Sequence, residues 1–161
     1  MKTSIITLML LSFFFVSTGQ TIDSLSKKDT VYLKIGDINN GWLYSEIKEQ
    51  GIKFPDLVFA QAILETGHFK STVFRDNNNL FGMRLPKVRK TTAIGKKRGY
   101  ATYSDWIMSV QDYKLWQSSI PKKYLKNRET YIIYLQKVYC DCRNYTKQIK
   151  KIVNRYKTQL K

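Results

Sequence analysis

The residue of this sequence that is best placed for chemistry is Glu65, a single carboxylate that follows an apolar segment. Residues 57–64 read LVFAQAIL, which predicts a helix that is apolar on nearly every face and therefore buried. Glu65 then lies at the carbonyl end of this helix, where partial negative charge disfavours an ionised carboxylate. Apolar neighbours disfavour the ionised form again through desolvation. The sequence therefore predicts a raised pKa for Glu65, which a general acid working near neutral pH requires.

The plainer interpretation of Glu65 is a carboxylate at a helix end that points into water, because helices often end in Glu near the surface. The sequence supplies little else for chemistry. His68 is the single histidine, and it cannot form a catalytic triad or a metal site with the two cysteines, Cys140 and Cys142. We therefore predict no metal and no cofactor. The two cysteines are two residues apart and could pair only in a turn, so their state stays open.

Two segments around Glu65 carry a family resemblance. Residues 60–71, AQAILETGHFKS, and residues 77–84, NNNLFGMR, follow each other at a short spacing. Together they resemble the core motif of bacterial endo-β-N-acetylglucosaminidases, which cut peptidoglycan and include the hydrolase domain of the flagellar rod-assembly protein. The resemblance implies an α+β, mostly α, lysozyme-like fold with a small β-hairpin forming one wall of the cleft. It also implies that Glu65 is the catalytic acid.

The same resemblance implies four substrate-binding residues, each with a structural alternative. Asn78 and Asn79 would hold an N-acetyl sugar by their side-chain amides, or they would form a turn that shapes the cleft. Tyr103 would lie near the reacting sugar, or it would be the hydrophobic staple of the helix that follows it. Tyr145 would face the cleft, or it would belong to the core.

The second catalytic group is where this chain departs from the family. Relatives often carry a second carboxylate on the hairpin, but here no Asp or Glu lies between Asp76 and Asp105. One possibility is substrate assistance, in which the sugar's own 2-acetamido oxygen attacks the anomeric carbon with help from Tyr103. The other is inversion, in which Asp76 or Asp105 activates a water molecule.

Mostly helices are predicted to position these residues. They run from Asn39 or Asn40 to about Gln50, from Pro55 to Glu65, from a cap at Ser104 to before Pro121, from Arg128 to Tyr139, and onward from a cap at Asn144. The inner sides are predicted to include Trp42, Leu43 and Ile47 in the first helix, and Val138 in the fourth. A further turn is predicted at Ser71–Phe74.

The connecting segments are predicted to be a loop and a hairpin. Asp76 to Asn79 reads as a polar loop rich in residues that tolerate left-handed backbone. Leu85 to Tyr103 reads as a β-hairpin, with Thr91–Ile94 in its first strand, Gly95–Lys97 at its tip and Arg98–Tyr103 in its second strand.

The N-terminus predicts export. Residues 1–19 combine Lys2, an apolar run and small residues, which is typical of a secretory signal peptide. Residues 20–38 are predicted to be an N-terminal arm and residues 39–161 the glucosaminidase domain. We therefore expect an exported protein of the periplasm, cell wall or extracellular space, with no stable membrane insertion after signal cleavage.

The charge of the chain predicts an anionic partner. The net charge is +16, and seven Lys and Arg with no acid lie between Asn77 and Ser104. We predict a monomer that binds peptidoglycan glycan strands and cleaves the β-1,4 bond between N-acetylglucosamine and N-acetylmuramic acid. One alternative is a non-hydrolytic cationic cell-wall-binding protein. Another is a nucleic-acid binder, but the export signal favours no nucleic acid.

Overall fold

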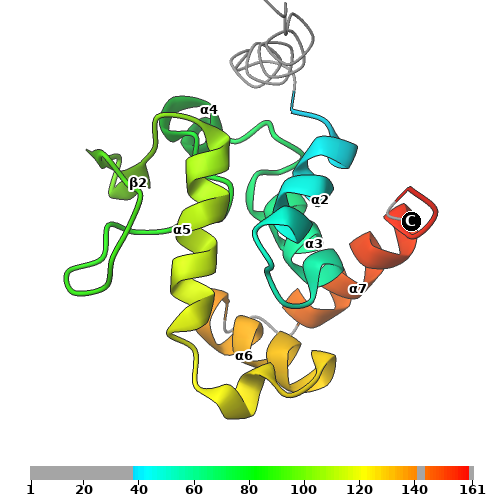
Figure 1. Ribbon diagram of the computed structural model, residues 1–161. Coiled ribbons are helices and arrows are strands. Elements are labelled where there is room, and N and C mark those ends of the chain that lie inside the picture. The colour runs from blue at the N-terminus through cyan, green and yellow to red at the C-terminus, as the bar shows by residue number, and fades with distance from the viewer. Residues whose placement is uncertain (1–37, 141–143, 160–161) are drawn as a thin grey trace, which may run out of the picture. The chain divides into compact units, whose positions relative to one another are not determined.

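The computed structural model describes residues 38–140 and 144–159, which are mostly helical with one small hairpin (Figure 1). The elements are α2 (Asn40–Glu49), α3 (Pro55–Glu65), α4 (Thr72–Asn77), β1 (Gly95–Lys97), β2 (Tyr100–Thr102), α5 (Trp106–Ser118), the 3₁₀ helix η1 (Lys122–Leu125), α6 (Arg128–Tyr139) and α7 (Tyr145–Tyr156). The predicted signal peptide, nearly all of the predicted N-terminal arm and Cys142 lie outside the described residues.

Helix α3 is the core of the described part, as its apolar sequence predicted. It runs from Pro55 to Glu65 with the predicted bounds, and every residue from Leu57 to Ile63 is buried. Helices α2 and α7 pack directly against it. The chain leaves the helix through Gly67, whose φ of +55° is a left-handed conformation that glycine adopts without strain.

Helix α2 begins at the predicted cap. The Asn39 side chain accepts a hydrogen bond of 2.9 Å from the Trp42 backbone amide. Leu43 and Ile47, four residues apart and therefore on one face, are fully buried. The prediction for Trp42 was wrong: its side chain is 38% exposed, because it precedes Leu43 by one residue and lies about 100° around the helix.

The hairpin exists, but its strands and tip are placed differently from the prediction. Lys97 pairs with Tyr100, so the two-residue turn is Arg98–Gly99. Both turn residues have positive φ, at 55° and 84°, as a tight antiparallel hairpin requires. Gly95 has no positive φ and lies in strand β1, which explains why it could not form the predicted tip.

Two further helix boundaries differ from the sequence prediction. Asp105, and not Ser104, caps α5, because its side chain accepts the hydrogen bond of 3.0 Å from the Met108 amide. The predicted turn at Ser71–Phe74 extends through Asn77, so Asp76 is helical and only Asn78 takes the left-handed conformation, with φ of 52°.

The two last helices match the sequence prediction closely. Helix α6 has the predicted bounds, and Tyr131, Ile132 and Leu135 are buried in it. Val138, which was predicted to point inward, is instead 48% exposed. Helix α7 begins after Asn144 and buries Tyr145, Ile149 and Ile152 against the rest of the fold. Within residues 38–140 and 144–159, no helix has the length and apolar character needed to span a membrane.

Candidate active site

A cleft of about 550 Å³ lies at the carboxyl end of α3. Its walls come from α3, the start of α4, the segment before the hairpin, strand β2, α5 and the end of α6. The residues that line it are Glu65, Ser71, Val73, Asn79, Gly82, Met83, Arg84, Pro86, Arg89, Tyr100, Trp116, Val138 and Tyr139. A cleft of this size, open to solvent and with one carboxylate at the end of a buried helix, fits the predicted acid site.

Glu65 is half-buried in this cleft and has one hydrogen-bond donor close by. The Tyr145 hydroxyl at the start of α7 donates a bond of 3.2 Å to Glu65 Oε1. On the other side, a Cβ at Gly82 would lie 3.8 Å from Glu65 Oε2. Gly82 also has a φ of +61°, so a glycine there serves both the backbone turn and the open space beside the carboxylate.

The environment of Glu65 raises its pKa, as predicted. Burial is the main cause, because desolvation disfavours the charged carboxylate. The hydrogen bond from Tyr145 acts in the opposite direction and to a smaller extent, since it stabilises the carboxylate. The net result is a carboxyl group that keeps its proton to higher pH than a carboxyl group in water does.

Asn79 lines the cleft, and its side chain holds the cleft wall together. Its amide nitrogen donates bonds of 2.9 Å to the carbonyl groups of both Met83 and Ala101. Its oxygen accepts from the backbone amides of Phe81, at 3.3 Å, and Met83, at 3.0 Å. These bonds join the segment after α4 to strand β2. Sugar binding by Asn79 stays a prediction, since its polar atoms already have backbone partners.

Asn78 makes a similar connection beside the cleft. Its amide nitrogen donates bonds of 3.1 Å to the carbonyl groups of Tyr103 and Ser104. Asn78 therefore ties the end of α4 to the segment that leads into α5. It is not among the cleft-lining residues, and its contact with substrate also stays a prediction.

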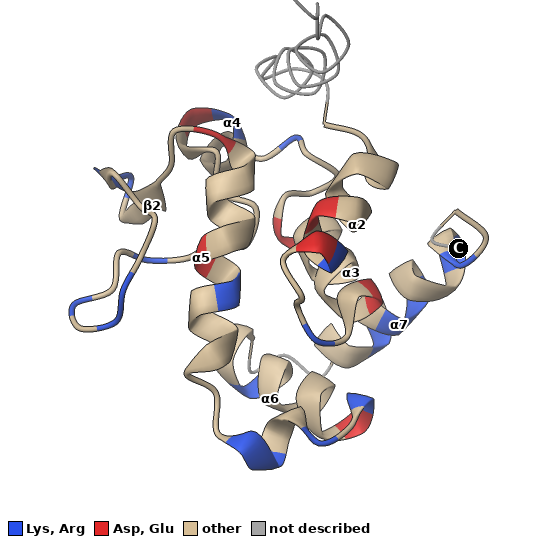
Figure 2. Cartoon of the chain, viewed as in Figure 1, with Lys and Arg blue, Asp and Glu red and all other residues tan. Residues whose placement is uncertain are grey.

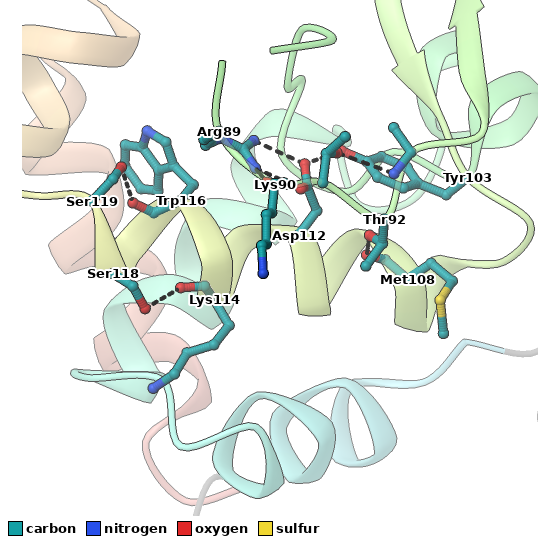
Figure 3. A network of polar contacts seen from close by, with 12 residues as sticks. Arg89, Lys90, Thr92, Tyr103, Met108, Asp112, Lys114, Trp116, Ser118 and Ser119 are labelled. Carbon is teal, nitrogen blue, oxygen red and sulfur yellow. Dashed lines mark hydrogen bonds and ion pairs between the residues drawn. The ribbon is translucent and has the colours of Figure 1, made fainter. Parts of the chain in front are cut away.

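Tyr103 takes part in a buried ion-pair network beside the cleft (Figure 3). Its side chain is 1% exposed, and its hydroxyl donates a bond of 2.8 Å to Asp112 Oδ2. Arg89 donates to both oxygens of the same carboxylate, at 2.6 and 2.9 Å. The structure thus separates Tyr103 from Tyr145, which reaches Glu65. Because the Tyr103 hydroxyl is bonded to Asp112, a contact of Tyr103 with the reacting sugar stays a prediction.

The two candidates for a second catalytic carboxylate are both engaged elsewhere. Asp76 pairs with Arg98 at 3.0 Å and with Lys97 at 3.7 Å at the turn of the hairpin. Asp105 caps α5. Neither lines the cleft, and Glu65 is the one carboxylate among the cleft-lining residues that the structure describes.

Three residues that contribute to the cleft wall were not predicted as site residues from the sequence. Arg89 comes from the segment before the hairpin, Trp116 from α5 and Tyr139 from the end of α6. Burial raises the pKa of Tyr139 far above its usual range, and the Glu65 charge nearby adds to this effect. The basic character of residues 77–104 pointed toward Arg89, but no motif distinguished it from its neighbours.

Comparisons with known proteins give a consistent assignment. Residues 42–158 match the glucosaminidase family described as mannosyl-glycoprotein endo-beta-N-acetylglucosaminidase. Protein bax of Escherichia coli is 44% identical over 57 residues, which are 35% of this chain and 21% of that relative. The chain therefore matches about a fifth of the length of this curated relative.

A solved structure has a similar fold. The catalytic domain of the autolysin Auto from Listeria monocytogenes superposes with a TM-score of 0.55 at 19% sequence identity. The match covers 86% of this chain and 97% of that domain. At this identity the likeness concerns the fold, and it agrees with the predicted mostly α architecture with a small hairpin at the cleft.

Proposed function

The chain belongs to the glucosaminidase family of glycoside hydrolases, and on this basis we propose that it is a peptidoglycan hydrolase that cleaves between N-acetylglucosamine and N-acetylmuramic acid. The bond would be the β-1,4 link on the reducing side of N-acetylglucosamine. The observation that carries the proposal is the half-buried Glu65 in an open cleft, with burial raising its pKa. The similar solved domain is named as that of an autolysin, which supports a wall glycan as substrate. The family description names an endo-beta-N-acetylglucosaminidase, which supports cleavage next to N-acetylglucosamine.

In the proposed first step, Glu65 gives its proton to the glycosidic oxygen while the bond from that oxygen to the anomeric carbon breaks. The 2-acetamido oxygen of the same N-acetylglucosamine attacks the anomeric carbon and forms a cyclic intermediate. Substrate assistance suits this cleft because Asp76 and Asp105, the other candidates, are held by Arg98 and by the α5 amide groups.

In the proposed second step, a water molecule attacks the anomeric carbon and Glu65, now a carboxylate, takes a proton from that water. The acetamido group re-forms, and the new reducing end keeps its β configuration. Tyr145 would keep the Glu65 carboxylate oriented through both steps, since its hydroxyl is the donor on Oε1. Tyr103 would act indirectly, by holding Asp112 and Arg89 in the cleft wall.

The proposal is tested by Glu65→Gln, which keeps the shape of the side chain and removes its acidic proton. Loss of a general acid lowers the rate by about 100- to 10,000-fold, and we expect release of dye from labelled peptidoglycan to fall within this range. Glu49→Gln is the matched control, because Glu49 is exposed at the end of α2. Activity of the Glu65→Gln protein close to that of the Glu49→Gln protein would refute the assignment.

Mass spectrometry of the released fragments tests the bond. We expect N-acetylglucosamine at every new reducing end, whereas N-acetylmuramic acid there would identify a different specificity.

A second candidate function is the non-hydrolytic, cationic wall-binding protein, which the single carboxylate of the cleft favours. If this second function is correct, the protein should sediment with insoluble peptidoglycan but release no soluble fragments from any peptidoglycan preparation.

Export is part of the proposal and rests on the sequence of residues 1–19. Its test is the N-terminal sequence of the protein recovered from the medium or the cell envelope. We expect a start near residue 20, since the small residues before it suit cleavage.

A further inference from the structure

A second hollow lies beside the candidate active site and is strongly cationic. It has a volume of about 440 Å³ and is lined by Arg84, Leu85, Lys87, Lys96, Arg98, Gly99 and Tyr100. Four of these seven residues carry a positive charge, and none is acidic. Figure 2 shows the Lys and Arg positions along the hairpin and the segment before it.

The positive charge of this hollow is largely uncompensated. Asp76 pairs with Arg98 at 3.0 Å and with Lys97 at 3.7 Å, and Asp112 pairs with Arg89. Across residues 38–140 and 144–159, no ion pair involves Arg84, Lys87 or Lys96. Like charges held together in this way repel each other, and an anionic ligand relieves the repulsion.

The hollow adjoins the cleft. Arg84 and Tyr100 line both, so a chain that lies in the cleft passes directly beside the cationic residues. Lys87 comes from the segment before the hairpin and Lys96 from strand β1, and both are exposed. Because Arg84 and Tyr100 are shared, a branch of a glycan held in the cleft would lie next to a hollow that exposes both lysines.

We propose that this cationic hollow binds the carboxylates of the peptide stem attached to the glycan that is being cut. This inference rests on the proposed function, because the stem peptide is part of the peptidoglycan that the cleft would cut. Stem peptides are flexible branches on N-acetylmuramic acid, and each carries several carboxylates. Their charge is complementary to the cationic residues of the hollow, which adjoins the cleft that would hold the glycan. The hollow thus selects strands that keep their stems over bare glycans.

The test compares two substrates that differ in charge alone. One is purified glycan strands with intact stems, and the other is the same strands after their carboxylates are converted to carboxamides with carbodiimide and ammonia. The variant is the double substitution Lys87→Gln/Lys96→Gln, which removes two charges that line the hollow but not the cleft. The matched control is Lys151→Gln/Lys157→Gln, two exposed lysines in and just after α7.

We expect the Lys87/Lys96 variant to raise KM for intact strands by roughly three- to tenfold with kcat unchanged, as for the loss of two exposed ion pairs. Its KM for amidated strands should equal that of the unmodified protein. The control variant should leave both KM values unchanged. An equal rise of KM on both substrates, no rise on either, or the same rise in the control variant would each overturn the proposal.

A binding measurement separates this proposal from the proposed function. The Glu65→Gln protein, with and without the two lysine substitutions, is titrated with intact and amidated strands. Tighter binding of intact strands that disappears with Lys87→Gln/Lys96→Gln supports the hollow, whether or not the protein has turnover. If fragments never appear from any strand but this binding difference persists, the hydrolytic function fails and the stem site stands.

Discussion

At the scale of single residues, two features of the structure act on the pKa of Glu65 in opposite directions. Burial at the end of α3 raises its pKa, and the hydrogen bond from Tyr145 lowers it by a smaller amount. The balance keeps the pKa above that of a carboxyl group in water while leaving Glu65 able to release its proton during the reaction.

Tyr145→Phe removes the influence that lowers the pKa of Glu65. If protonated Glu65 is the active form, the alkaline limb of the kcat/KM profile should move to higher pH by roughly 0.4 to 1 unit, the equivalent of one hydrogen bond. Tyr124→Phe is the control, because Tyr124 lies in η1 and does not line the cleft. An unmoved limb would show that Tyr145 does not act on the catalytic proton.

The raised pKa of Glu65 also has a consequence for stability. A carboxyl group whose pKa is higher in the folded protein binds protons more tightly there, so it destabilises the fold once the pH exceeds both pKa values. Glu65→Gln should therefore raise the free energy of unfolding at neutral pH. The difference from the unmodified protein should shrink as the pH falls through the folded pKa and vanish below the unfolded pKa. Urea titrations at several pH values measure this, and a constant difference at all pH values would contradict it.

At the scale of elements, the cleft depends on ties between segments that have little regular structure. Asn79 joins the segment after α4 to β2, and Asp112 on α5 holds Arg89 from the segment before the hairpin. Burial alone would raise the pKa of Asp112, but the bonds from Arg89 and Tyr103 outweigh it, so that pKa is lowered. The ionised pair is therefore the state in which the cleft wall is assembled at neutral pH.

Asp112→Ala should destabilise the protein by about 3 to 5 kcal/mol, because it leaves Arg89 with an uncompensated charge next to the core. The Arg89→Ala/Asp112→Ala double variant should be less destabilised than the sum of the two single variants by about 1 to 3 kcal/mol. Urea unfolding provides the measurement. Additive effects would mean that the pair contributes no coupling.

The chain offers a matched control for this pair. Arg128 and Asp56 have the same shortest N···O distance, 2.6 Å, but their side chains are 46% and 22% exposed, against 19% and 0% for Arg89 and Asp112. Asp56→Ala should therefore cost only about 1 kcal/mol or less, since exposed ion pairs contribute little. If Asp56→Ala lowered the free energy of unfolding as much as Asp112→Ala, burial would not explain the large effect expected for the Arg89–Asp112 pair.

Several elements were predictable because their signals are local. The bounds of α3 and α6 follow from Pro55 in the first turn of α3 and from the apolar spacing along each helix. The hairpin tip was misplaced because Gly95 and Gly99 are equally good turn residues in sequence, and only the pairing of Lys97 with Tyr100 selects Gly99. The predicted cap Ser104 was wrong because Ser and Asp are both favoured cap residues, and only the hydrogen bond from the Met108 amide identifies Asp105.

The site was predictable only where a motif or a helix end marked it. Glu65 stood out because it ends an apolar helix, and its raised pKa followed from that position. Arg89 and Asp112 are 23 residues apart, and no spacing rule brings such residues together. Their contact depends on the path of the chain between α4 and α5. The same holds for Tyr139, which reaches the cleft because α6 ends beside α3.

At the scale of the whole molecule, the net charge of +16 creates a field that attracts any polyanion. Figure 2 shows Lys and Arg on α7 and on the helices near η1 as well as on the hairpin. The Lys and Arg residues of α7 are not among the residues that line the cleft, so they would attract an anionic polymer at long range. The cationic hollow beside the cleft would instead bind anionic groups by direct contact. These two contributions differ in their response to salt, since screening weakens long-range attraction first.

Wall binding should therefore fall steeply with salt. Between about 0.1 M and about 1 M, the Debye length shrinks from about 10 Å to about 3 Å, which removes most attraction between separated charges. The Glu65→Gln protein, which we expect to digest the wall far more slowly, can be sedimented with insoluble peptidoglycan over this range. We expect its bound fraction to fall with salt, while binding to neutral chitin, which lacks carboxylates, should change little. A salt-independent bound fraction on the wall would mean that contacts inside the cleft, and not charge, hold the protein on its substrate.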